Sequence, residues 1–194
     1  MTKLAILLGG AVLVAACSTN RQEVSMPVVT AMDPNDPLTA PGFLAQAGSG
    51  SMFEIQSSQL ALQVSQNQAV RNFANLIIAD HQRLMQAAAA AAASAGITPP
   101  PPVLLPPHQA ALEQLRAAGA GPAFDIAFRQ AQIDAHQQAL TLMQNYATSG
   151  DVPALRAAAS QSIPTLQMHL QQAQVLPVAA PAFPAPPPNQ GERG

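Results

Sequence analysis

Apolar residues recur every three or four positions between about residues 39 and 176, which is the spacing of amphipathic α-helices. The pattern predicts four long helices, at about residues 39–65, 67–95, 121–150 and 151–176, and a short helix at 108–118. Thr39, Asn67 and Asp151 precede three of these segments and are predicted to be N-caps. Long stretches rich in β-branched residues, which would indicate strands, are absent.

The connections between the predicted helices differ in length. Those near residues 66 and 150 are short, whereas residues 96–121 form a long connection containing Pro99 to Pro102 and Pro106-Pro107. Extended proline-rich chain advances about 3.1 Å per residue, so this connection can travel the length of a bundle. The sequence therefore predicts an all-α, ferritin-like four-helix bundle with a long crossover between its second and third long helices.

The amino terminus has the features of an export signal. Lys3 supplies a positive charge, Leu4 to Ala16 is uncharged, and Cys17 is the one cysteine of the chain. A membrane-spanning helix needs about 20 apolar residues, and this stretch is shorter. Val14-Ala15-Ala16-Cys17 also resembles the lipobox of bacterial lipoprotein signals, which implies that Cys17 is lipidated and anchors the protein to the membrane. The alternative is a spare thiol after an ordinary signal.

Proline clusters divide the rest of the chain. We expect a signal peptide at residues 1–16, a flexible tether at 17–38, the helical domain at 39–176 and a proline-rich disordered tail at 177–194. Ser18 follows the cysteine, and in lipoproteins of bacteria with two membranes a residue other than Asp there implies the outer membrane. The expected location is therefore the cell envelope, with the protein anchored in the outer membrane and facing the periplasm.

Composition excludes some functions. The net charge is −2, charged residues make up 9% of the chain, and it has one Tyr and no Trp, so nucleic-acid binding lacks both electrostatic attraction and stacking surfaces. No glycine-rich phosphate loop, nucleophile elbow or His-Glu-x-x-His motif is present. These absences favour a protein that is not an enzyme, and they leave a protein partner unidentified.

Three of the four histidines, His81, His136 and His169, fall on inward stripes of long helices, and Glu54 takes the matching position on the first helix. At about 1.5 Å per residue, Glu54, His81 and His136 share one level of the bundle. His169 comes out one or two turns closer to the turn near residue 66. The fourth histidine, His108, is predicted to be a surface or capping residue.

Two hypotheses explain the inward histidines and Glu54. In one, the four side chains bind a transition-metal ion. In the other, they hydrogen-bond to one another and fix the register of the helices. A di-iron centre would need Glu three residues before His on two helices, but Ile78, Ile133 and Leu166 stand there. Asp80 is predicted at the edge of its stripe, paired with Arg83.

Several short motifs occur in a fixed order along the predicted helical domain. They are Phe43-Leu44, Gly50-Ser51-Met52-x-Glu54, Phe73-Ala74-x-x-Ile77-Ile78-x-Asp80-His81, Phe124-Asp125, Gln132-x-x-x-His136, Leu155-Arg156, Pro164-Thr165-Leu166 and His169-Leu170. Over about residues 39–176 this set resembles the bacterial domain of unknown function family 4142. The resemblance implies a ferritin-like bundle on exported, often lipid-anchored proteins, and it implies no particular activity.

Together these observations favour an exported, lipid-anchored helical protein with a non-enzymatic binding or stress-related role. The alternative hypothesis is a metal-binding or redox protein that uses Glu54, His81, His136 and His169. No cofactor is required by the first hypothesis, and a transition-metal ion is required by the second.

Overall fold

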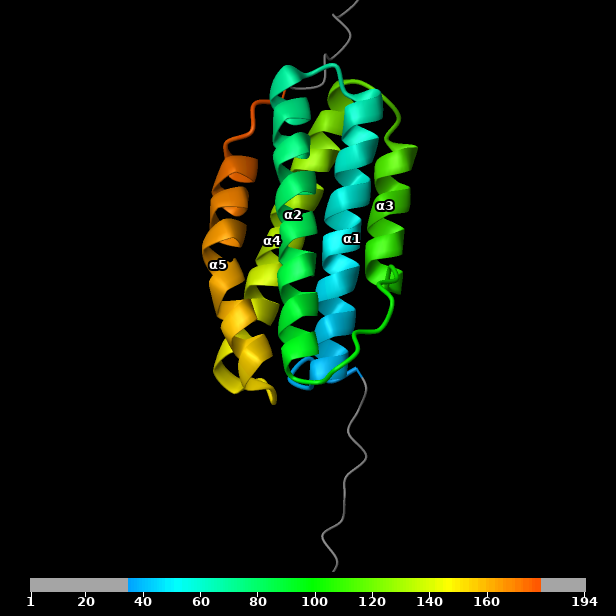
Figure 1. Ribbon diagram of the computed structural model, residues 1–194. Helices are drawn as coiled ribbons and strands as arrows, with labels where there is room; N and C mark the ends of the chain where they lie inside the picture. The colour runs from blue at the N-terminus through cyan, green and yellow to red at the C-terminus, as the bar shows by residue number, and fades with distance from the viewer. Residues whose placement is uncertain (1–34, 179–194) are drawn as a thin grey trace, which may run out of the picture. The chain divides into compact units, whose positions relative to one another are not determined.

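The computed structural model describes residues 35–178 and contains five helices and no strand within that range (Figure 1). The all-α prediction is therefore confirmed. The predicted signal peptide, Cys17, most of the tether and residues 179–194 of the tail lie outside the described residues. The helices are α1 (Ala40–Val64), α2 (Gln68–Ser94), α3 (Pro106–Ala117), α4 (Pro122–Ser149) and α5 (Pro153–Gln174).

Two of the predicted helix caps are present. The Thr39 hydroxyl accepts the backbone N–H of Gly42 at 3.4 Å, at the start of α1. The Asn67 side-chain oxygen accepts the N–H of Ala69 at 2.9 Å, at the start of α2. Both bonds satisfy N–H groups that the first turn of a helix leaves without a partner.

The capping role predicted for Asp151 is wrong. The N-cap of α5 is Val152, and no side chain caps this helix. Asp151 instead accepts the N–H of Ala40 in the first turn of α1 at 3.1 Å and the Tyr146 hydroxyl at 2.7 Å. The first-turn N–H groups of α1, like those of α5, lack partners within their own helix. The Asp151 carboxylate bonds to α1 rather than to α5. Asp151 therefore ties the turn between α4 and α5 to the start of α1.

The chain returns along the bundle between α2 and α4, and α3 is part of that return. Figure 1 shows α3 beside α1, and it contacts both α1 and α4. Ser49 of α1 holds this segment, because its hydroxyl accepts the N–H of Leu105 at 2.8 Å and bonds to Nδ1 of His108 at 2.7 Å. His108 also stacks on Phe53, with ring centroids 5.7 Å apart, so it is half-buried against α1. The N-cap of α3 is Leu105 rather than His108.

The buried apolar residues form two clusters at opposite ends of the long helices. One contains Phe53, Phe73 and Phe128 near the α1–α2 turn, and the other contains Phe43, Tyr146 and Leu155 near the start of α1. Between them every long helix contributes a buried polar residue. These residues, which we call the polar layer, are Ser57, Ser58, Glu54, Asp80, His81, Gln132, His136 and His169.

The packing of the two clusters therefore fixes the height of the polar layer from both sides. Within the described range, no helix meets the combined requirements of length and hydropathy for a transmembrane segment.

Replacing Asp151 with Ala tests the tie between α5 and α1. We expect the free energy of unfolding to fall by about 2–3 kcal/mol, because the Tyr146 hydroxyl and the Ala40 N–H lose a charged acceptor. Urea denaturation measures this change. Asp134→Ala is the matched control, because Asp134 is exposed and bonds only to Gln130 on its own helix. Equal stability of the two variants would contradict the assigned role.

Candidate metal centre

His81 of α2, His136 of α4 and His169 of α5 converge in the polar layer. One ring nitrogen from each lies within 4.8 Å of the other two. All three side chains are buried, with relative exposures of 2% for His81 and 0% for His136 and His169. Their rings pack edge to face or stacked, with centroids 5.2–5.7 Å apart. Three helices thus present imidazole nitrogens to one small volume that excludes solvent.

The proton on His136 can be assigned from its neighbours. Nδ1 lies 2.8 Å from the backbone carbonyl of Gln132. A carbonyl oxygen only accepts hydrogen bonds, so Nδ1 carries the proton and donates it. In the neutral ring the lone pair is then on Nε2, which points toward His169.

The same argument fixes His169. Its Nε2 lies 2.8 Å from Oδ2 of Asp80. Burial acts to raise the pKa of Asp80, but hydrogen bonds from His169 and Arg83 outweigh burial and hold the pKa below its ordinary value. The carboxylate is ionised and only accepts, so Nε2 of His169 donates. The lone pair of the neutral ring is on Nδ1.

Two nitrogen lone pairs consequently face each other, because Nε2 of His136 and Nδ1 of His169 are 3.2 Å apart. A shared proton or a cation must lie between them, since two lone pairs repel. Two nitrogens bound at about 2.0–2.1 Å to one ion are about 2.8 Å apart as neighbours in a square-planar site and about 3.3 Å apart in a tetrahedral one. The observed separation therefore fits two ligands of a single metal ion.

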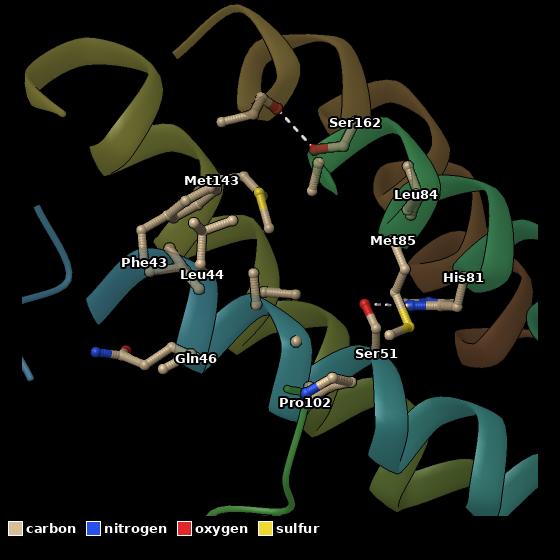
Figure 2. A pocket seen from close by; sticks show the side chains of 18 of the residues that line it. Phe43, Leu44, Gln46, Ser51, His81, Leu84, Met85, Pro102, Met143 and Ser162 are labelled. Carbon is tan, nitrogen blue, oxygen red and sulfur yellow. Dashed lines mark hydrogen bonds between the residues drawn. The ribbon is translucent and has the colours of Figure 1, made fainter. Parts of the chain in front are cut away.

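His81 is arranged in a similar way. Its Nδ1 lies 3.4 Å from the hydroxyl of Ser51 on α1, and Figure 2 shows this pair at the edge of a pocket. Its Nε2 is buried and makes no hydrogen bond within the protein. With Nδ1 bonded to Ser51, Nε2 is available as a third ligand.

Burial keeps the three rings neutral, and only neutral imidazole binds a metal ion. Burial lowers the pKa of His136 to about 4, against the opposing hydrogen bond to Gln132. It also lowers the pKa of His169, although Asp80 acts in the other direction. Burial holds the pKa of His81 well below its ordinary value, and repulsion from His136 or His169 would lower that pKa further if either ring gained a proton. The cluster therefore needs no deprotonation at neutral pH before an ion binds.

Glu54 lies beside this cluster and is not a member of it. Its Oε1 is 3.3 Å from Nδ1 of His136, which is the nitrogen that faces away from His169. Neither carboxyl oxygen makes a hydrogen bond within the protein. Burial raises the pKa of Glu54 well above its ordinary value, and the nearby side chain of Gln132 offsets only part of this rise.

His169 contacts His136 directly, although counting along the helices placed it one or two turns nearer the turn between α1 and α2. One helical turn is about 5.4 Å, and two rings that point toward each other span that distance. Pro164 also lies inside α5 and removes a backbone hydrogen bond one turn before His169, where the helix can bend.

The sequence-based prediction of a pair between Asp80 and Arg83 is confirmed. What the sequence pattern missed is the second contact of Asp80, its hydrogen bond to His169 across the bundle. It also missed Ser51 and the Gln132 carbonyl as partners of the rings. Gln132 stands four residues before His136, and this spacing on a helix was the available signal.

The match to known families agrees with the described geometry. A family model described as "Domain of unknown function (DUF4142)" matches residues 26–176. The chain belongs to this family. No curated protein matches the DUF4142 chain significantly. Among solved structures, the chain is similar to one titled "CopM in the Cu(II)-bound form", with a TM-score of 0.57 and 20% sequence identity. That likeness covers 70% of this chain and 93% of the other, and at this identity it shows a shared helical fold.

Replacing Glu54 with Gln tests the environment of this acid. A raised pKa means that the folded state binds the proton more tightly than the unfolded state. Glu54 therefore destabilises the fold increasingly as the pH rises above about 4.5. We expect Glu54→Gln to raise the free energy of unfolding at pH 8, because Gln carries no charge that burial disfavours.

The gain should shrink toward zero near pH 4.5, where the unfolded wild type is also protonated. Urea denaturation of both proteins from pH 4.5 to 8 measures the difference, and the histidines contribute equally to both. A gain that does not depend on pH would show that Glu54 is not a perturbed acid.

Proposed function

We propose that this protein binds one transition-metal ion through His81, His136 and His169, and that the ion is Cu(II). The observation that carries the proposal is the pair of lone pairs on His136 and His169, 3.2 Å apart. Imidazole nitrogen is a ligand suited to copper, zinc, iron and nickel. Copper is favoured among these because the similar solved structure is that of a protein in a Cu(II)-bound form.

The surroundings of the three rings support a ligand role. Metal-binding histidines usually donate their other N–H to a carboxylate, a backbone carbonyl or a similar acceptor. Here His169 donates to Asp80, His136 donates to the Gln132 carbonyl, and His81 lies against the Ser51 hydroxyl. Each partner fixes which nitrogen is left for the ion. Arg83 in turn holds the Asp80 carboxylate.

These contacts support the metal-binding or redox hypothesis better than the non-enzymatic binding or stress-related role. The ion would supply one-electron redox chemistry or a store of exchangeable metal. The protein's own residues would orient the rings, keep them neutral and exclude water. The order of helices also supports a ferritin-like classification, in which core sites are built from side chains on facing helices.

The proposed location remains the one that the amino terminus indicates. A lipid on Cys17 would anchor the metal-binding domain to the cell envelope, facing the periplasm from the outer membrane. This part of the proposal is supported by the sequence of residues 1–18 alone.

The metal proposal predicts one Cu(II) per chain after loading and dialysis, measured by elemental analysis and titration calorimetry. Loss of a residue that hydrogen-bonds to a ligand can weaken metal binding by about 100-fold. His136→Ala removes a ligand itself and should weaken binding by more than this. His108→Ala is the matched control, because His108 is half-buried on α3 and lies outside the cluster. It should retain full stoichiometry.

Asp80→Ala separates a designed site from adventitious binding. It removes no ligand, yet it should weaken binding by about 10–100-fold because His169 loses the acceptor that fixes its tautomer. The proposal would be contradicted if His136→Ala and Asp80→Ala both bound Cu(II) with wild-type affinity. It would also be contradicted if His108→Ala lost as much Cu(II) binding as His136→Ala.

A further inference from the structure

The protein contains a cavity of about 500 Å³ beside the metal centre, and His81 forms part of its lining. Residues of α1, α2, α4, α5 and the crossover line it, and Figure 2 shows its interior. Small-molecule sites in proteins are typically cavities of about 300–1,000 Å³ with mostly apolar walls and a few polar groups. The size of this cavity fits a small organic molecule.

The walls are largely apolar. Leu44, Leu84, Met85 and Met143 point toward the same space in Figure 2, from three different helices. Small residues widen it, because Ala87, Ala88 and Ala89 of α2 also line the cavity. An aliphatic or aromatic body would bury its surface against these side chains.

One polar group on the cavity lining stands out. Glu54 is a lining residue, it is 2% exposed, and neither of its carboxyl oxygens makes a hydrogen bond within the protein. A buried carboxyl without hydrogen bonds is unfavourable. A ligand that donates an N–H or O–H to Glu54 would remove this penalty.

We propose that the cavity binds an apolar organic molecule with one hydrogen-bond-donating amine or hydroxyl group, and that Glu54 accepts this hydrogen bond. The cavity walls recognise the body of the molecule and Glu54 orients its head. The proposal goes beyond metal binding. The cavity and the metal centre share His81, but Glu54, which orients the organic ligand, lies outside the histidine cluster.

The probe for the test is N-phenylnaphthylamine, an apolar aromatic amine whose fluorescence rises in apolar surroundings. The full chain is titrated in excess chelator, so the outcome is independent of the metal proposal. We expect saturable binding of one probe per chain. Phenylnaphthalene, which lacks the N–H, should displace the probe with a dissociation constant about tenfold higher than that of the probe itself. The reason is that phenylnaphthalene forms no hydrogen bond with Glu54.

Two pairs of variants test the assigned residues. Glu54→Leu removes the acceptor and should weaken probe binding about tenfold. Glu54→Gln keeps an acceptor oxygen and should bind as the wild type does. Ala88→Phe fills the cavity and should abolish binding, whereas Ala90→Phe, at an exposed position of the same helix, should not. Thermal melts followed by circular dichroism check that each variant is folded.

Several results would overturn the proposal. These are the absence of saturable binding to the wild type, equal binding by folded Glu54→Leu, and equal binding by folded Ala88→Phe. If Glu54→Leu does not fold, Glu54→Gln and the competition with phenylnaphthalene still test the hydrogen bond. None of these results bears on Cu(II) binding, which is measured separately with the histidine variants.

Discussion

The described structure depends on one contact, the 3.2 Å approach of Nε2 of His136 to Nδ1 of His169. Each ring gives its proton to an acceptor on its other side, the Gln132 carbonyl and the Asp80 carboxylate. Burial keeps both rings neutral. The lone pairs that remain repel each other unless a shared proton or a metal ion lies between them. The proposed metal site rests on this requirement.

The fold is arranged so that this contact cannot relax. An apolar cluster packs on either side of the polar layer, and the three histidines come from three helices. A shift of one ring away from another would require a helix to slide past close-packed neighbours, and protein interiors resist such movement. A layer of buried polar groups lowers stability unless its groups are paired. Its presence in the middle of an otherwise apolar core is typical of a functional site.

The sequence predicted the helices well because helical periodicity and N-caps are local signals. It also predicted that His81, His136 and His169 face inward, because each stands on the apolar stripe of its helix. It could not predict which nitrogen of each ring carries the proton, because that depends on partners from other helices such as Asp80 and Ser51. The wrong role predicted for Asp151 has a related cause, because it bonds to α1, which is not close in sequence. The bond from Ser49 to His108 is equally distant in sequence.

Glu54 shows the same limit from another direction. Its inward position on a stripe of small residues was apparent in the sequence, and it suggested a fourth metal ligand. The structure brings its carboxyl to the side of His136 that faces away from His169, where it lines the cavity. The difference is a matter of a few ångströms around one ring, which axial spacing along helices does not resolve. The polar layer therefore has two sides: the histidine cluster, proposed to bind an ion, and the cavity face with Glu54, proposed to bind an organic ligand.

X-ray absorption spectroscopy of the Cu(II)-loaded protein tests the central claim most directly, because multiple scattering from imidazole rings reports the number of bound histidines. Three imidazole nitrogens bound to one ion are expected in the wild type. In a variant that lacks His136 and His169, at most one bound imidazole should remain. A spectrum with at most one imidazole, or with sulfur as the dominant ligand, would contradict the account.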